Sequence, residues 1–264
     1  MISINELKRI AAKKKIALSV VEKDYAITWV LYSLSKTEFK QYFIFKGGTA
    51  LRKIYFPDWR YSEDLDFTIP KKFNENELKE IINKINSFLS ENVGITLNIK
   101  SLHLNPEYAQ IKIQFLGPLN NKNTIKIDLS FNEPIISTPN NKNIHSEYSD
   151  KEKNNLLVYS LEEILAEKIR SILQRAKTRD YYDVWKILKS HNNKINTNLL
   201  HKIIIKKCQI KKLIFNKNDL FSSKRIKPAQ EYWEKSLAHQ INNLPNFKTV
   251  VSECKNLINK FLKK

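Results

Sequence analysis

Only four of the 264 residues are glycine, and two of them, Gly47 and Gly48, are adjacent. A short aromatic and β-branched run at residues 42–45 precedes this pair, and a helix-compatible run at residues 49–53 follows it. Because glycine has no Cβ, a Gly-Gly pair permits a tight turn that other residues adopt only with strain. The pattern predicts a strand, a turn and a helix, so the chain combines both kinds of secondary structure.

Strand-like alternation recurs along the first half of the chain. The alternating segments are residues 64–69, 95–99, 111–115 and 125–131. Between the first two, Asn74 and Glu77 form the pattern of a helix-capping box. The helix that they begin carries one apolar stripe, formed by Leu78, Ile81, Ile82, Ile85 and Leu89. Helical spacing also runs through residues 5–38, so the first half predicts a mixed sheet with flanking helices.

The character of the sequence changes after the predicted sheet. Residues 138–155 form a polar tract with few apolar residues, which predicts a boundary between domains. Beyond it, Ser160 and Glu163 match a second capping box, on a long helix through Leu173, and helical patterns continue from there. We therefore expect an α+β domain at residues 1–155 and a helical C-terminal domain at residues 156–264.

Charge and cysteine content indicate the partner and the compartment. The 46 lysines and arginines exceed the 27 aspartates and glutamates, which gives a net charge of +19. Such a charge attracts polyanions, so nucleic acid is the first partner to consider, although an AT-rich genome would account for part of the lysine excess. Two distant cysteines, Cys208 and Cys254, favour a reducing cytoplasm, and no apolar run approaches the length of a membrane span.

Three acidic residues fall on predicted strands. Asp64 and Asp66 are two apart on one strand, so their carboxylates share a face and repel each other unless a cation binds them. Asp128 lies on the face of the segment 125–131 that is opposite to its apolar residues. Together the three acids fit a site for two Mg²⁺ ions, as used in phosphoryl or nucleotidyl transfer. The alternative is that they are hydrated surface acids.

The glycine pair offers a second part of such a site. Gly47, Gly48 and Thr49 precede a predicted helix, so their N–H groups lie at the positive end of its dipole, where a nucleotide phosphate can bind. Ser62 is two residues before Asp64, near enough to bind phosphate or metal. The spacing is not that of a P-loop, and an ordinary turn is the alternative at both places.

More charged residues follow in the predicted helical domain. Lys168 occupies the apolar stripe of its helix, where it either extends its amine to solvent or holds a nucleotide phosphate. Arg179, Asp180 and Asp183 follow at a predicted helix start near Thr178. The two acids either serve a nucleotide site or complement the helix dipole.

Five motifs along the chain match one known pattern. They lie at residues 22–25 (Glu-Lys-Asp-Tyr), 45–51 (Phe-Lys-Gly-Gly-Thr-Ala-Leu), 60–67 (Arg-Tyr-Ser-Glu-Asp-Leu-Asp-Phe), 162–169 (Glu-Glu-Ile-Leu-Ala-Glu-Lys-Ile) and 179–183 (Arg-Asp-Tyr-Tyr-Asp). In this order they resemble the AbiEii/AbiGii toxin family of nucleotidyltransferases, over roughly residues 20 to 190. One departure is that fifteen residues separate Gly48 from Asp64, which is longer than in many nucleotidyltransferases, so this segment has to fold back.

The resemblance implies a polymerase-β-like nucleotidyltransferase fold followed by a helical C-terminal region. It implies a magnesium-dependent toxin that transfers a nucleotide from an NTP to RNA, with transfer RNA as the acceptor. The setting would be a bacterial toxin–antitoxin or phage-defence system, with a cognate antitoxin as a possible partner. By carry-over, the nucleotide and metal site would contain Gly48, Ser62, Asp64 and Asp66, the nucleotide contact would be Lys168, and the final motif would supply Asp180 or Asp183.

The residues and the resemblance together suggest one mechanism. We expect Asp64, Asp66 and Asp128 to hold two Mg²⁺ ions, and Asp128 to accept the proton of an attacking RNA 3′-hydroxyl. The amides of residues 47–49 and the amine of Lys168 would neutralise the departing pyrophosphate. Two alternatives are nucleotidylation of a protein hydroxyl by the same site, and a non-catalytic basic protein that binds nucleic acid.

Overall fold

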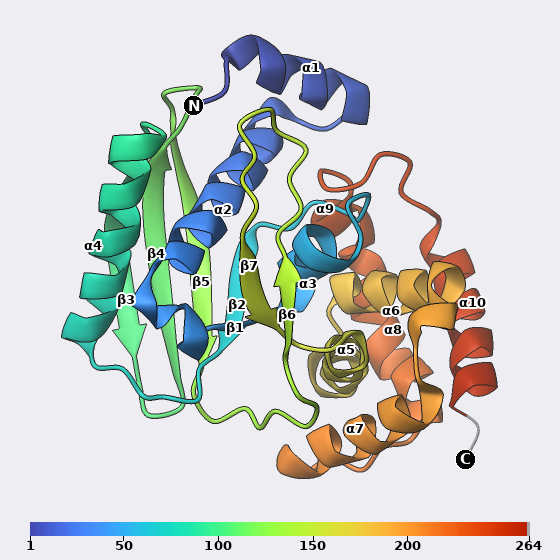
Figure 1. The fold of residues 1–264 in the computed structure, drawn as a ribbon. Helices are drawn as coiled ribbons and strands as arrows, with labels where there is room; N and C mark the ends of the chain where they lie inside the picture. Colours follow the sequence, from blue (N-terminus) through green and yellow to red (C-terminus); the bar gives the residue numbers. More distant parts are fainter. Residues whose placement is uncertain (263–264) are drawn as a thin grey trace. The chain divides into compact units, whose positions relative to one another are not determined.

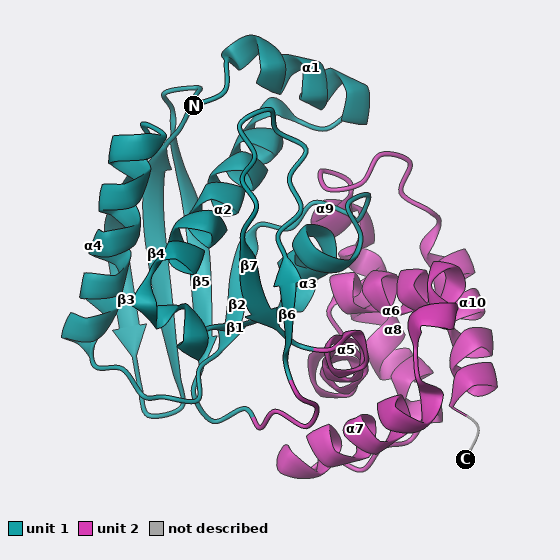
Figure 2. Cartoon of the chain, in the orientation of Figure 1, with its two compact units in different colours: residues 1–133, 139–159 teal, residues 134–138, 160–264 magenta. Residues whose placement is uncertain are grey.

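The computed structural model describes residues 1–262, and the chain divides into two compact units (Figure 2). The first unit comprises residues 1–133 and 139–159, and the second comprises residues 134–138 and the chain from Ser160 onward. The polar tract at residues 138–155 carries a strand of the first unit and lies almost wholly within that unit. Among the described residues, no helix has the length and apolar character needed to cross a membrane.

The first unit is built around one mixed sheet (Figure 1). Its helices are α1 (Ile4–Lys14), α2 (Leu18–Lys36), α3 (Gly47–Ala50) and α4 (Glu75–Asn92), with a 3-10 turn η1 (Glu38–Tyr42) and a π-helical turn η2 (Leu51–Tyr55). Its strands are β1 (Ile44–Lys46), β2 (Asp64–Thr68), β3 (Thr96–Leu104), β4 (Tyr108–Leu116), β5 (Lys122–Ser130), β6 (Asn140–Asn143) and β7 (Asn155–Val158). Their order across the sheet is β3-β4-β5-β2-β1-β7-β6, with the pairs β2–β5 and β1–β7 parallel and the others antiparallel.

One face of this sheet is covered by α2 and α4 (Figure 1). Phe67 of β2 and Ile127 and Leu129 of β5 point to that side, where they line an apolar core together with Ile81 and Ile82 of α4. This face explains why the strand segments alternate in the sequence, since each second residue is buried under a helix. The intervening residues of β2 and β5 therefore point away from α2 and α4.

Local sequence patterns set most element ends. Asn74 and Glu77 form the predicted capping box at the start of α4. The first strand begins at Ile44, later than predicted, because residues up to Tyr42 complete the 3-10 turn η1. The following helix begins at Gly47 itself and not after the glycine pair, so the turn and the helix start coincide.

The second unit is formed by helices. They are α5 (Leu161–Arg175), α6 (Thr178–Ser190), α7 (Thr197–Ile210), α8 (Ser223–Glu231), α9 (Trp233–Leu237) and α10 (Phe247–Phe261), with 3-10 turns η3 (Asn192–Lys194) and η4 (Asn218–Phe221). α5 packs against α6 and α7, and α6 packs against α10. Tyr181 of α6 meets Phe247 of α10 edge to face in this core, where both are buried.

The start of α5 differs from the predicted capping box. Ser160 accepts a hydrogen bond from the N–H of Glu163 as expected, but the Glu163 side chain does not complete the box. Its fully buried carboxylate instead accepts two backbone N–H groups of residues 134–138, at 2.8 and 2.9 Å, and pairs with Lys207 at 3.0 Å. Glu163 thus fastens this short segment to the second unit, a long-range role that local spacing could not indicate.

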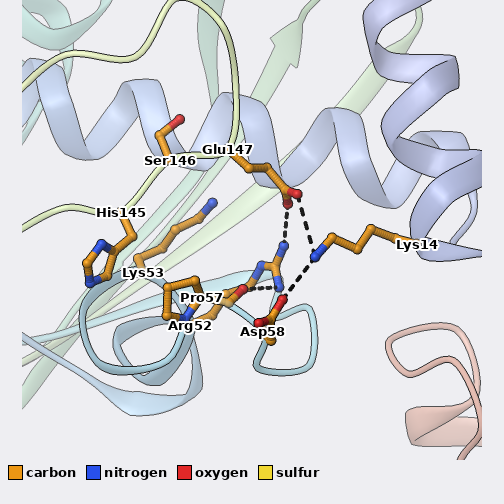
Figure 3. Close-up of a pocket in the computed structure, with 8 residues that line it drawn as sticks. All are labelled: Lys14, Arg52, Lys53, Pro57, Asp58, His145, Ser146 and Glu147. Carbon is orange, nitrogen blue, oxygen red and sulfur yellow. Dashed lines mark hydrogen bonds and ion pairs between the residues drawn. The ribbon is translucent and has the colours of Figure 1, made fainter.

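In the first unit, a buried ion network joins α2 to the turn η2. Asp24 of α2 is 1% exposed and pairs with Arg52 at 2.9 Å and with Lys53 at 2.5 Å. Arg52 also pairs with Glu147 at 2.8 Å, beside a polar cavity of about 210 Å³ (Figure 3). Because η2 continues directly from α3, this network helps to fix the position of the glycine turn.

Asp24→Asn would leave two buried cations without their carboxylate. We expect it to lower the free energy of unfolding by about 3–5 kcal/mol, because breaking a buried pair strands a charge. Asp58→Asn is the control, since the Asp58 side chain is 92% exposed in its pair with Lys14 and should contribute less than about 1 kcal/mol. Urea denaturation measures both, and equally small losses would contradict the structural role of the network.

The lowered pKa of the Asp24 carboxyl group should make the stability of the protein depend on pH in acid. Burial raises the pKa of Asp24, but the charges of Lys53 and Arg52 and its hydrogen bonds outweigh burial and bring the pKa from 3.8 to about 2. Folding therefore favours the ionised form, so this contribution is complete above pH 3.8 and is lost as the pH falls through about 2. Denaturation curves across that range should show this loss in the natural protein and not in Asp24→Asn.

Candidate active site

A row of polar side chains crosses the sheet on the face turned away from α2 and α4. Asp66 of β2 is the cross-strand partner of Lys46 on β1 and of Asp128 on β5. Asp128 is in turn paired with Gln110 of β4, whose amide donates a hydrogen bond of 2.9 Å to its carboxylate. Two of the three predicted acids are thus direct neighbours, and Gln110 orients one of them.

A second row contains the third acid and a lysine. Asp64 of β2 is the cross-strand partner of Lys126 on β5. The Lys126 ammonium is 2.9 Å from a carboxylate oxygen of Asp128 and 3.6 Å from one of Asp64. Burial lowers the pKa of Lys126, but the hydrogen bond to Asp128 and the charges of the three acids outweigh it and raise the pKa above its usual value. A charged ammonium therefore bridges the two rows.

The glycine turn is packed against the same groups. Gly47 has a φ of +79°, and a Cβ there would lie 2.2 Å from a carboxylate oxygen of Asp66. At Gly48 a Cβ would lie 2.7 Å from the Arg60 guanidinium and 3.0 Å from the Ser62 hydroxyl. Position 47 therefore needs glycine, because its φ is positive and its backbone lies against the Asp66 side chain, and Gly48 lies close to the ends of the Arg60 and Ser62 side chains.

The segment between Gly48 and Asp64 folds back, as its length required. It forms the second half of α3, then η2 and a loop, and returns the chain to β2 as an antiparallel neighbour of β1. The hydroxyl of Thr49, which is fully buried, donates a hydrogen bond to the backbone carbonyl of Asp64. Thr49 thereby ties the glycine turn to the first residue of the acidic strand.

The acids of this face provide oxygen ligands of the kind that hard divalent cations prefer. The position of the Lys126 ammonium between Asp64 and Asp128 shows that positive charge is accommodated there. Within residues 1–262, however, no three acidic, histidine or cysteine side chains converge in a metal-binding arrangement. The residue types fit a metal ion, and side-chain rotation would be needed for the three acids to share one.

In the second unit, Lys168 of α5 contacts both acids of the α6 motif. Its ammonium is 3.0 Å from Asp180 and 2.8 Å from Asp183, whose side chains are 4% and 0% exposed. Lys168 is thus part of a nearly buried ion cluster. Its amine does not extend into solvent, which was one of the two alternatives from the sequence. Arg179, beside these acids on α6, is half-buried. The structure therefore groups Lys168 with Asp180 and Asp183, as it groups the three strand acids within the first unit.

Comparison with known proteins decides the family. A family model described as nucleotidyl transferase AbiEii toxin, Type IV TA system, matches residues 29–253. The chain belongs to the AbiEii family of nucleotidyltransferase toxins. The resemblance deduced from the five motifs is confirmed, as is the expectation that the chain is a nucleotidyltransferase.

Solved structures agree with this AbiEii fold. MenT4, a nucleotidyltransferase toxin from Mycobacterium tuberculosis H37Rv, is similar with a TM-score of 0.76 and 16% identity, covering 100% of this chain and 91% of that one. A putative nucleotidyltransferase from H. pylori is similar with a TM-score of 0.62 and 17% identity, covering 93% of this chain and 96% of that one. The expected α+β nucleotidyltransferase fold is confirmed. No curated protein sequence matched the chain.

Four polar residues that lie beside the predicted acids or the glycine turn were not predicted as site residues from the sequence. They are Lys46, Arg60, Gln110 and Lys126. Lys126 had a local signal, because it is two residues before Asp128 and so shares its strand face. Gln110 had no such signal, because its place beside Asp128 follows from the pairing of β4 with β5.

Gly47→Ala tests the packing of the turn against Asp66. The new Cβ would displace the Asp66 carboxylate, so we expect nucleotide transfer to be lost, along with about 1 kcal/mol of stability from the positive φ. Gly94→Ala is the matched control, because Gly94 has a φ of +78° but a Cβ there would meet only the flexible Met1 side chain, at 3.3 Å. The control should lose similar stability and keep its activity. Equal activity of the two variants would contradict the role of the turn.

Proposed function

We propose that this AbiEii-family enzyme transfers a nucleotide from an NTP to the 3′-hydroxyl of an RNA, with transfer RNA as the acceptor, in a magnesium-dependent reaction. The observation that carries this proposal is the set of Asp64, Asp66 and Asp128 on one face of two adjacent strands, against the glycine turn. Three neighbouring carboxylates repel one another and a bound polyanion, and the single ammonium of Lys126 does not balance all three, so a divalent cation would stabilise them.

In this proposal the strand acids bind the metal and activate the acceptor. Two Mg²⁺ ions held by Asp64, Asp66 and Asp128 would supply Lewis-acid stabilisation of the charge on the transferred group. Asp128 would accept the proton of the 3′-hydroxyl, with its carboxylate oriented by the hydrogen bond from Gln110. Attack of that hydroxyl oxygen on the α-phosphorus forms the new ester bond and releases pyrophosphate.

Nucleotide binding is proposed for the remaining motif residues. In the first unit these are Gly47, Gly48, Thr49 and Ser62, which offer backbone N–H groups and a hydroxyl near the acids. In the second unit they are Lys168, Arg179, Asp180 and Asp183. The two buried acids would orient the Lys168 ammonium, which would neutralise a phosphate.

The partners follow from charge and family. The net charge of +19 supports binding of an RNA backbone through phosphate contacts that do not read its sequence. The family model places its members in type IV TA systems, which supports a cognate antitoxin for this chain and a role in toxin–antitoxin function or phage defence. A cytoplasmic location agrees with an RNA acceptor and an NTP donor.

Loss of the strand acids tests the reaction. Asp64→Asn combined with Asp66→Asn should reduce transfer of labelled nucleotide to total RNA by at least about 100-fold, and chelation of Mg²⁺ should do the same. Each NTP is tested in turn, and Asp58→Asn is the surface control. Full transfer by the double variant would refute the proposed site, and label in protein instead of RNA would make a protein hydroxyl the acceptor.

Lys168→Met tests the proposed nucleotide contact. We expect the KM for the NTP to rise about tenfold or more, because a phosphate loses its cationic partner. The variant also strands two buried acids and will lose stability, so Lys168→Arg, which keeps the charge, is measured beside it. A loss of stability with an unchanged KM in both variants would show that Lys168 is only structural.

A further inference from the structure

Lys126 occupies a particular place among the acids of the proposed site. It is two residues before Asp128 on β5, and it is the cross-strand partner of Asp64 on β2. Its ammonium lies 2.9 Å from Asp128 and 3.6 Å from Asp64, so one cation contacts carboxylates of two strands.

The bridge offsets a repulsion that the sheet creates. Pairing of β2 with β5 brings Asp66 opposite Asp128, and strand alternation adds Asp64 to the same face. Carboxylates held this close disfavour each other's ionisation unless a cation is present. The Lys126 side chain is 37% exposed, and its long flexible stem allows the ammonium to approach the acids or leave them.

We propose that Lys126 is a built-in counter-ion that competes with the divalent cation for Asp64 and Asp128. In the metal-free enzyme its ammonium neutralises these carboxylates, and the ammonium leaves them when the metal binds. Lys126 is therefore a positioning residue that sets how much divalent cation the site needs. This inference rests on the proposed function, because it assumes that the strand acids bind metal.

The competition has a measurable consequence for metal affinity. Lys126→Met removes the competing cation, so Mn²⁺ should bind roughly 3- to 10-fold more tightly than to the natural protein. The measurement is the signal of free Mn²⁺ in electron paramagnetic resonance, without nucleotide. If Lys126 instead helped to hold the ligands in place for the metal, the same variant would bind Mn²⁺ more weakly.

Two control variants separate competition from a general change in charge. Lys112 of β4 is the cross-strand neighbour of Lys126 and is exposed, so Lys112→Met removes one positive charge from the same face without touching the bridge. This variant should change the Mn²⁺ affinity less than twofold, because salt screens the interaction of an exposed charge with the metal site. Lys126→Arg keeps a cation and should retain weak binding. An equal gain in Lys112→Met and Lys126→Met would overturn the inference.

Thermal unfolding gives a second readout that does not depend on activity. Without metal, Lys126→Met should unfold at a lower temperature than the natural protein, because the acids lose their counter-ion. Added Mg²⁺ should raise its unfolding temperature by more than it raises that of the natural protein. Equal responses to Mg²⁺ would contradict competition.

The outcome also distinguishes this inference from the proposed function. If Mn²⁺ binding to the natural protein requires Asp64 and Asp66 but Lys126→Met does not tighten it, only the role of Lys126 is refuted. If neither the natural protein nor Lys126→Met binds Mn²⁺ in a manner that depends on these acids, the metal site itself is refuted.

Discussion

Repulsion between carboxylates is the constraint on which the candidate site depends. The pairing of β2 with β5 places Asp66 beside Asp128, and Asp64 shares their face. The surrounding residues respond to this concentration of negative charge. Lys126 bridges two of the acids, Gln110 donates a hydrogen bond to Asp128, and the backbone at Gly47 approaches Asp66 without an intervening side chain. The other face of the same strands is apolar and lies under α2 and α4, which fixes the direction in which the acids point.

A second set of charges acts at a distance from those acids within the first unit. Asp24 holds Arg52 and Lys53, two consecutive residues of the π-helical turn that continues from the glycine helix. π-Helical turns are rare and occur often at functional sites. Here the turn brings two neighbouring cations to one buried carboxylate. The short helix that presents Gly47 and Gly48 is thus anchored by an ion network as well as by the hydrogen bond of Thr49 to Asp64.

Much of this arrangement could be predicted from local sequence. The alternation of apolar and polar residues in β2 and β5 identified the strands and placed Asp64, Asp66 and Asp128 on the polar face, because a strand repeats every two residues. The capping box of α4 was also a local pattern.

What local patterns could not supply was pairing between distant segments. The place of Gln110 depends on the β4–β5 pair, and the true partners of Glu163 belong to a segment 26 and 27 residues earlier in the chain. Glutamate at that position matched a capping box in sequence, but a buried lysine and two backbone amides bind its carboxylate instead.

The short segment at residues 134–138 has a consequence for how this chain can be divided. It leaves the first unit, contributes backbone groups to the second, and returns before the chain crosses again after Tyr159. The two units are therefore joined by three stretches of backbone, and no single cut yields two complete halves. A fragment that begins at Ser160 would retain the buried Glu163 but lose the backbone amides that donate to its carboxylate. It would also lack the carbonyl of Pro134, which accepts a hydrogen bond of 2.7 Å from Lys207. Gene fission or domain exchange at the obvious helical boundary would thus deprive the helical unit of part of its own interior.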